Sequence, residues 1–339
     1  MTSELLRYSM ANNYLMAKPN LGYLCEQKSL LRGGHGSWRR SARRNASAFI
    51  TVLSGTADKI GWLRADLIGR SCGRFLLSVT TLLALVLAEQ ASAEAVDVGH
   101  IVRANGIQTE NSTIVVKRLS DGRIWVSNPE RAQKRYSPAS SSKIPHTLIA
   151  IESGVASPDS VFRWDKVPRS NIRWNQDHTL SSAFQFSVVW VYQEIARRAG
   201  AEKMSEWLVR FDYGNMNVGS SQQLETYWLD DTLQISASEQ IEFLSKLALG
   251  RLPLSVGTYN SAKQIMVSDR GASWVIRSKT GWRYSTDSTD IGWFVGWLEC
   301  ASESYVFALN MDMPDTRFLS KRKTLAYSVL ENIGAFNCD

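Results

Sequence analysis

The order of strand and helix patterns constrains the fold of this chain more than any other feature. Residues 112–119, "STIVVKRL", and 123–128, "RIWVSN", are joined by the turn signal Asp121-Gly122 and predict a β-hairpin. Strand patterns return only much later, at 273–281, 291–299 and 304–312. Since the strands come from both ends, we predict an α+β fold: a central antiparallel sheet built from both chain ends and flanked by helices, with an inserted mainly helical region.

Helix start and stop signals locate four helices. One is expected to begin near Ser140, and a second spans 187–200 and is stopped by Gly200. The stretch 236–250 carries a capping box formed by Ser236 and Glu239. A last helix is expected at about 320–334.

The positive charge of the chain is confined to its first part. The net charge is +7, from 39 basic and 32 acidic residues. Residues 1–93 hold 12 basic and 5 acidic residues, so residues 94–339 carry 27 of each and are neutral. A basic surface for nucleic acid is therefore not expected on the folded part, and no nucleic-acid partner is predicted.

That first part has the pattern of a secretory leader. Arg70 and Arg74 precede an apolar run at 75–88, which is followed by the small residues Ala91-Ser92-Ala93. We predict a signal peptide within 1–93, cleaved after Ala93, and one folded domain at 94–339. The alternative is a membrane anchor, but the run has 14 residues, whereas a spanning helix needs about 20. No stable membrane anchor is therefore expected.

The cysteines and histidines do not form a metal motif. Cys25 and Cys72 lie in the predicted leader, so Cys300 and Cys338 allow one disulfide at most, and the sequence leaves open whether they pair. The histidines are scattered: His35, His100, His146 and His178. No HExxH, HxH or CxxC occurs, and no metal site is predicted.

The stretch "SPASSSKIPHTL", residues 137–148, contains the first candidate for chemistry. Side chains three or four positions apart share a helix face, so Lys143 is aligned with Ser140 and not with Ser141 or Ser142. A hydroxyl beside an amine is a candidate nucleophile with its base. The alternative is an ordinary helix cap, because serine is favoured at helix starts.

Four further motifs follow in order, and each alone has an ordinary structural explanation. Ser187-Val188-Val189 is consistent with another cap, and "DYGN" at 212–215 with a turn. Trp228, between two helices, is consistent with a core aromatic residue. "SKTGW", at 278–282, closes a strand pattern. The ordered set, with each motif in its expected strand, loop or helix, is far more specific than any one member.

With this set in place the chain resembles the serine penicillin-recognising enzymes and, within them, the class D (oxacillinase-type) β-lactamases. The resemblance runs from about 112 to 335 and includes "PASSSKIPHTLIA", "FRWD", "WNQDHTL", "SVVWVYQEIAR", "FDYGN", "YWLDDTLQISASEQIEFL", "SKTGW", "GWFVGWLE" and "ALNMDMP". "YGN", and Ser-x-Val in place of the Ser-x-Asn of class A enzymes, indicate class D. The resemblance implies a β-lactamase/transpeptidase-like fold and a single catalytic domain at 94–339.

The resemblance also implies a catalytic role for several motif residues. Ser140 Oγ would attack the β-lactam carbonyl and form an acyl-enzyme, with the backbone N–H groups of Ser140 and Trp282 as the oxyanion hole. Lys143 would lose its charge through burial and react with CO2, giving a carbamate base and no need for another cofactor. Ser187 would pass a proton to the leaving nitrogen. The implied catalytic set is Ser140, Lys143, Ser187, Val188 and Trp228.

A second set is implied for substrate binding: Lys279, Thr280, Gly281, Trp282 and Arg322. Lys279 and Thr280 offer a charge and a hydroxyl to the substrate carboxylate. Arg322 fits the family's carboxylate-binding arginine, although Arg317 and Lys321 lie nearby. Two residues depart from the family: Ser141 stands where Thr is common, and Ser142 where Phe is common. The small polar Ser142 is expected to admit more water near Lys143.

The predicted function is therefore hydrolysis of penicillins and related antibiotics in the periplasm, by a monomer or homodimer. The runner-up is a penicillin sensor that stops at the acyl-enzyme; such sensors normally hang from several membrane spans. A cell-wall transpeptidase or carboxypeptidase and a protein with a decayed site are weaker alternatives, given the intact motif set.

Overall fold

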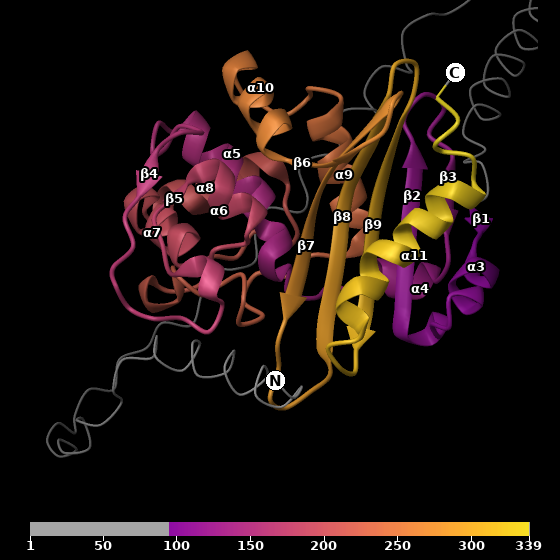
Figure 1. Cartoon of the computed structure of the whole chain (residues 1–339), viewed down its shortest axis with the longest axis horizontal. Helices are drawn as coiled ribbons and strands as arrows, with labels where there is room; N and C mark the ends of the chain where they lie inside the picture. The colour runs from indigo at the N-terminus through magenta and orange to yellow at the C-terminus, as the bar shows by residue number, and fades with distance from the viewer. Residues whose placement is uncertain (1–94, 339) are drawn as a thin grey trace, which may run out of the picture. The chain divides into compact units, whose positions relative to one another are not determined.

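A seven-stranded sheet forms the centre of the computed structural model, which describes residues 95–338 (Figure 1). In spatial order its strands are β1 (Val96–Asp97), β3 (Ile124–Val126), β2 (Ser112–Arg118), β9 (Ser304–Met313), β8 (Asp290–Cys300), β7 (Trp274–Arg283) and β6 (Val267–Arg270). All neighbours are antiparallel except β1 and β3. The predicted α+β fold, with a sheet from both chain ends, is confirmed. The predicted leader lies outside the described residues.

Helices cover both faces of this sheet. Figure 1 shows α11 (Phe318–Asn332) lying across one face, where Leu325 shares a buried cluster with Phe294 of the sheet and with Ile101 of α3 (Gly99–Ala104). The helices of the other, larger cluster are α4 (Pro129–Gln133), α5 (Lys143–Glu152), α6 (Leu180–Gln185), α7 (Val189–Ala199), α8 (Ala201–Phe211), α9 (Ala237–Ala248) and α10 (Val256–Ile265).

Coverage on both faces explains the sequences of the central strands. Strand β8 is buried at every position except Glu299, and β9 is nearly as buried. A strand that is buried on both faces has a continuous apolar sequence instead of an alternating one, as "IGWFVGWLE" has.

Short elements complete the chain. Two two-residue strands, β4 (Val161–Phe162) and β5 (His178–Thr179), pair with one another. The 3₁₀ segments are η1 (Thr109–Asn111), η2 (Ala139–Ser142), η3 (Ile172–Trp174) and η4 (Ser221–Gln223). Within residues 95–338 no helix is long and apolar enough to cross a membrane. No group of His, Cys, Asp or Glu there is placed to hold a metal ion.

The predicted helices lie close to their expected positions. Helix α7 ends at Gly200, whose φ is +80°, and α9 begins with the predicted capping box of Ser236 and Glu239. The helix expected near Ser140 differs in detail, because the chain first makes the 3₁₀ segment η2 and only then α5. Helices α6, α8 and α10 had no specific prediction within the mainly helical middle.

One edge of the sheet is only partly paired. Strand β6 pairs with β7 from Val275 to Arg277, and the N–H of Ser278 donates to Met266. From Lys279 onward, β7 has no strand neighbour on that side in the part of the chain that the structure describes. The "SKTGW" motif therefore lies on a free strand edge.

Cys300 and Cys338 form a disulfide, which answers the question that the sequence left open. The bond joins the end of β8 to the segment after α11, across a sequence separation of 38. Beside it, the ring of Phe336 packs on Trp274 with centroids 5.1 Å apart. The disulfide thus fastens the segment after α11 to the sheet.

We expect the double variant Cys300→Ser/Cys338→Ser to lose about 3–4 kcal/mol of unfolding free energy, because a loop of this length gains that much conformational freedom when the cross-link is absent. Urea unfolding with and without reductant checks this. Reductant should lower the wild-type midpoint to that of the variant and leave the variant unchanged; equal midpoints for both oxidised proteins would contradict the prediction.

Candidate active site

Ser140 and Lys143 come together in the turn before α5. Ser140 lies in η2, and residues three apart eclipse one another in a 3₁₀ turn. Lys143 Nζ lies 3.0 Å from Ser140 Oγ, within hydrogen-bond distance. Neither η2 nor α5 has a side-chain cap at its start. Ser140 therefore pairs with Lys143 and does not cap the helix.

The next two serines brace the turn from within. The Ser141 hydroxyl donates to the carbonyl of Pro138 (2.8 Å), and the Ser142 hydroxyl donates to that of Ala139 (2.7 Å). Both side chains are fully buried. Lys143, which follows Ser142, has an exposed fraction of 0%.

Burial decides the charge of Lys143. Desolvation favours the neutral amine and holds the pKa of Lys143 well below its usual range, and the positive charge of Lys279 lowers it further. The ring of Tyr192 lies beneath Nζ, with its centroid 4.9 Å away. The site thus contains an amine that can be neutral next to a hydroxyl.

Trp228 belongs to the same buried cluster as Tyr192 and Val188. Its side chain is fully buried, and its indole Nε1 has no hydrogen-bond partner in the described part of the chain. A buried N–H without an acceptor costs about 1–3 kcal/mol. Such an orphaned donor indicates that the pocket is built for an additional acceptor group.

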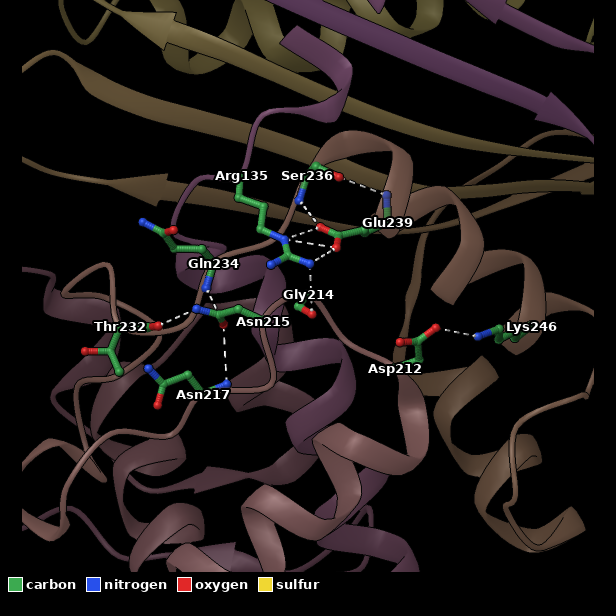
Figure 2. A network of polar contacts seen from close by, with 10 residues as sticks. All are labelled: Arg135, Asp212, Gly214, Asn215, Asn217, Thr232, Gln234, Ser236, Glu239 and Lys246. Atoms are coloured by element: carbon green, nitrogen blue, oxygen red, sulfur yellow. Dashed lines mark hydrogen bonds and ion pairs between the residues drawn. The ribbon is translucent and has the colours of Figure 1, made fainter. Parts of the chain in front are cut away.

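The "DYGN" motif holds the segment that follows Trp228, from Thr232 to Gln234 (Figure 2). The Asn215 side chain donates to the carbonyl of Thr232 (2.8 Å) and accepts from the N–H of Gln234 (3.0 Å). Gly214 has a φ of +59°, and a Cβ there would lie 2.1 Å from the carbonyl oxygen of Gln234. The motif therefore needs glycine for the close backbone approach and asparagine for the two hydrogen bonds.

The same network reaches the start of α9. Figure 2 shows the Arg135 guanidinium between the Glu239 carboxylate, to which it is ion-paired, and the carbonyl of Gly214 at 3.4 Å. Glu239 also accepts from the N–H of Ser236 at 2.8 Å. A second ion pair joins Asp212 to Lys246 of α9. The helix and the loop are thus fixed to one another.

Strand β7 approaches the turn that contains Ser140, at Gly281. A Cβ at Gly281 would lie 2.8 Å from the carbonyl of Pro138 and 3.2 Å from the backbone nitrogen of Ser141. Trp293 on β8 donates its indole N–H to the carbonyl of Ser137 at 2.8 Å. The strand and the turn therefore touch backbone to backbone.

Two basic side chains lie at this strand, Lys279 of β7 itself and Arg322 of α11. Lys279 is 5% exposed, and burial, with a smaller contribution from Arg322, lowers its pKa to about 7. The Arg322 guanidinium donates to the carbonyl of Gly281, and burial lowers its pKa to about 10. Of the alternatives, Arg317 is 84% exposed and pairs with Asp315, and Lys321 lies over Phe318. Arg322 is the one that reaches the β7 motif.

Ser187 lies in the turn before α7. Its φ is +58°, which is unusual for a residue other than glycine, and such strain is concentrated at functional sites. The N-cap residue of α7 is Val188, which is fully buried and makes no side-chain cap. Ser187 is therefore not the ordinary cap that its position allows.

A cleft of about 440 Å³ lies where the pairing of β6 with β7 stops and the free edge of β7 begins. It is lined by Lys279 and Thr280, by Phe184 and Gln185 from α6, and by Lys323 from α11. Trp282 lies further along the strand, where its indole donates to Asp290 at 2.8 Å.

Sequence reasoning missed several residues that hold the site. Gln240 donates to Ser141 at 3.1 Å and to Tyr213 at 3.2 Å. Arg283 pairs with Asp231, 52 positions away. These contacts join distant segments and leave no local signal. His146, by contrast, could have been found, since it is one helical turn from Lys143.

Comparisons with known proteins agree with this geometry. Residues 100–332 match the penicillin binding protein transpeptidase domain family. Beta-lactamase OXA-15 of Pseudomonas aeruginosa is 42% identical over 227 residues, 66% of this chain and 80% of the relative. Beta-lactamase OXA-48 of Klebsiella pneumoniae is 42% identical over 209 residues, 61% of this chain and 77% of that relative.

Solved structures give the same result. The class D β-lactamase YbXI from Nostoc superposes with a TM-score of 0.67 at 34% identity, covering 70% of this chain and 99% of that chain. The class D β-lactamase FUS-1 (OXA-85) from Fusobacterium nucleatum subsp. polymorphum gives the same score and identity, covering 70% of this chain and 97% of that chain.

We expect Gly214→Ala to lower the unfolding free energy by roughly 3 kcal/mol or more. The new Cβ would collide with the backbone of Gln234, and the alanine would also have to adopt a positive φ. Gly250 is the matched control, since its φ is +68° but nothing lies within 4 Å of its Cβ position. Gly250→Ala should cost only about 1–2 kcal/mol. Denaturant unfolding of both variants checks this, and equal losses would argue against the close approach.

Proposed function

Since the chain belongs to the class D serine β-lactamases, which hydrolyse β-lactam antibiotics and confer resistance to them, we propose that Ser140 is its nucleophile and Lys143, N-carboxylated by CO2, its general base. One observation carries the proposal: the fully buried Lys143 Nζ lies 3.0 Å from Ser140 Oγ.

The residues around Lys143 fit the carboxylated form. A neutral amine reacts with CO2 by forming an N–C bond from its lone pair and releasing one proton to solvent, and burial favours that neutral amine. The Trp228 indole N–H has no partner and would hold the new carboxylate. When present, the carboxylate supplies a base for the Ser140 proton and for the proton of the hydrolytic water.

Acylation and deacylation then proceed on Ser140. Its Oγ bonds to the β-lactam carbonyl carbon, the C–N bond breaks, and the proton lost by Ser140 reaches the ring nitrogen through the Ser187 hydroxyl. Water attacks the resulting ester, the ester C–O bond breaks, and Ser140 Oγ regains a proton. The backbone N–H groups of Ser140 and Trp282 would stabilise the oxyanion in both steps.

The carboxylate of the substrate is assigned to the positive end of the β7 cleft. Lys279 and Thr280 line the cleft, and Arg322 lies behind the strand on the Gly281 carbonyl. A bound carboxylate would favour the charged form of Lys279 and raise its pKa from about 7. Substrate binding therefore favours protonation of Lys279, and protonated Lys279 in turn binds the substrate carboxylate more tightly.

We expect the protein to turn over a penicillin and a chromogenic cephalosporin many times, faster with added bicarbonate. Ser140→Ala should abolish the reaction. Lys143→Ala should lower kcat by about 10²–10⁴-fold, the usual contribution of a general base. Hydrolysis assays with intact-mass measurement check this. One covalent equivalent that never leaves the wild type would instead identify a penicillin sensor and contradict the deacylation role of Lys143.

The CO2 requirement should rise as the pH falls. Carboxylation of a neutral amine releases one proton, so each unit of lower pH demands about ten times more dissolved CO2 for the same occupancy, and more below the pKa of Lys143, where the amine itself is protonated. Titration of the carbamate signal with ¹³C-labelled bicarbonate, at several pH values, checks this. A CO2 requirement independent of pH would rule out carboxylation as the activating step.

We further propose that the protein is exported and acts in the periplasm, as the leader pattern at 1–93 suggests. The secreted protein should then begin at Glu94. N-terminal sequencing of the protein released from the periplasm checks this, and a full-length membrane-bound product would support an anchor instead.

A further inference from the structure

His146 is a buried titratable residue that the proposed mechanism does not use. It follows Lys143 by three positions on α5, so both side chains lie on one face of the helix. We call the group formed by Lys143, His146, Tyr192, Tyr227 and Trp228 the lysine pocket. Every side chain in it is fully buried.

The imidazole of His146 packs directly on the indole of Trp228. The two rings meet edge to face, with centroids 4.7 Å apart and an interplanar angle of 84°. Tyr227 packs on the same indole at 4.9 Å and 89°. His146 also lies beside Tyr192, at 6.3 Å, the ring beneath Lys143 Nζ. The orientation of the indole thus depends on two neighbours that also touch one another.

A single hydrogen bond fixes the imidazole. Nε2 of His146 lies 2.6 Å from the hydroxyl of Tyr227. If Nε2 donated, the buried phenol proton would need another acceptor, and the described residues offer none. The phenol therefore donates to Nε2, and Nδ1 carries the ring proton. Burial lowers the pKa of His146 to about 3, with a smaller contribution from Lys143, so the ring is neutral.

Two N–H donors in the lysine pocket are left without partners, Nδ1 of His146 and Nε1 of Trp228. Both lie in one packed cluster around a buried amine. Buried donors are normally paired, so two orphans in one place indicate a pocket that is shaped for an additional acceptor.

We propose that His146 is a positioning residue, which holds the Trp228 indole in place for the carboxylated form of Lys143 through its edge-on contact and its bond to Tyr227. This inference rests on the proposed carboxylation of Lys143. His146 is not among the described residues that line the cleft. We therefore assign its effect to the occupancy of the modified lysine and not to substrate binding.

The test compares full-length wild type with His146→Phe and Tyr227→Phe. His146→Phe keeps a ring against the indole but removes both nitrogens, and Tyr227→Phe removes only the hydroxyl that orients the imidazole. His178→Asn is the matched control, because His178 is also buried but bonds to Ser182 and Arg173 outside the lysine pocket. The readouts are the ¹³C carbamate signal against dissolved CO2, and KM and kcat at saturating CO2.

We expect half-occupancy of the carbamate to need about tenfold more CO2 in His146→Phe and roughly threefold more in Tyr227→Phe, the size of effect expected from losing one buried hydrogen bond or its orientation. The KM of His146→Phe and of Tyr227→Phe at saturating CO2 should change by less than about twofold, because these residues do not line the substrate cleft. His178→Asn should keep the wild-type CO2 requirement, because His178 lies outside the lysine pocket.

Wild-type CO2 requirements in both His146→Phe and Tyr227→Phe would overturn the inference. If His146→Phe does not fold, the CO2 requirement of Tyr227→Phe alone tests the inference, because that variant loses only the hydroxyl group and is expected to fold. A wild-type protein without any carbamate signal would overturn the proposed role of Lys143, and this inference with it. A wild-type signal with unaffected variants overturns the inference alone.

Discussion

The burial of one amine is the constraint on which this site depends. Lys143 is fully enclosed in the interior behind Ser140, where its charged form is strongly disfavoured. A protein that buries an amine must either neutralise it or pair it with an anion. The lysine pocket has two N–H donors without partners and no described carboxylate on the amine. Its polarity therefore complements an anion that forms on the lysine itself.

The surrounding fold keeps this pocket rigid by joining segments that are distant in sequence. The turn with Ser140 touches β7 at Gly281, and Gln240 of α9 donates to Ser141. Asn215 holds the segment after Trp228 through Thr232 and Gln234, as Figure 2 shows. These contacts are a close backbone approach at Gly281 and buried hydrogen bonds of the Gln240 and Asn215 side chains, and such contacts allow little displacement.

The sequence alone predicted those features of the fold and the site that depend on residues close together in the chain. The spacing of Ser140 and Lys143 depends only on helical geometry, and the capping box of α9 is contained in four residues. The orientation of Trp228 could not be predicted, because it depends on ring contacts with Tyr227 and with His146, which is distant in sequence. The 3₁₀ form of the turn at Ser140 was also not predicted, since "ASSS" carries no signal that separates it from an α-helical first turn.

The free edge of β7 has a consequence for association between molecules. An exposed strand edge is a template for pairing with a second chain, and many proteins aggregate through such edges. Here Phe184 and Gln185 of α6 line the same cleft as Lys279 and Thr280 of the edge. Covering a strand edge with another element and placing a lysine on it are two ways in which proteins prevent such pairing. The edge that borders the cleft is therefore protected in both ways against pairing with a second chain.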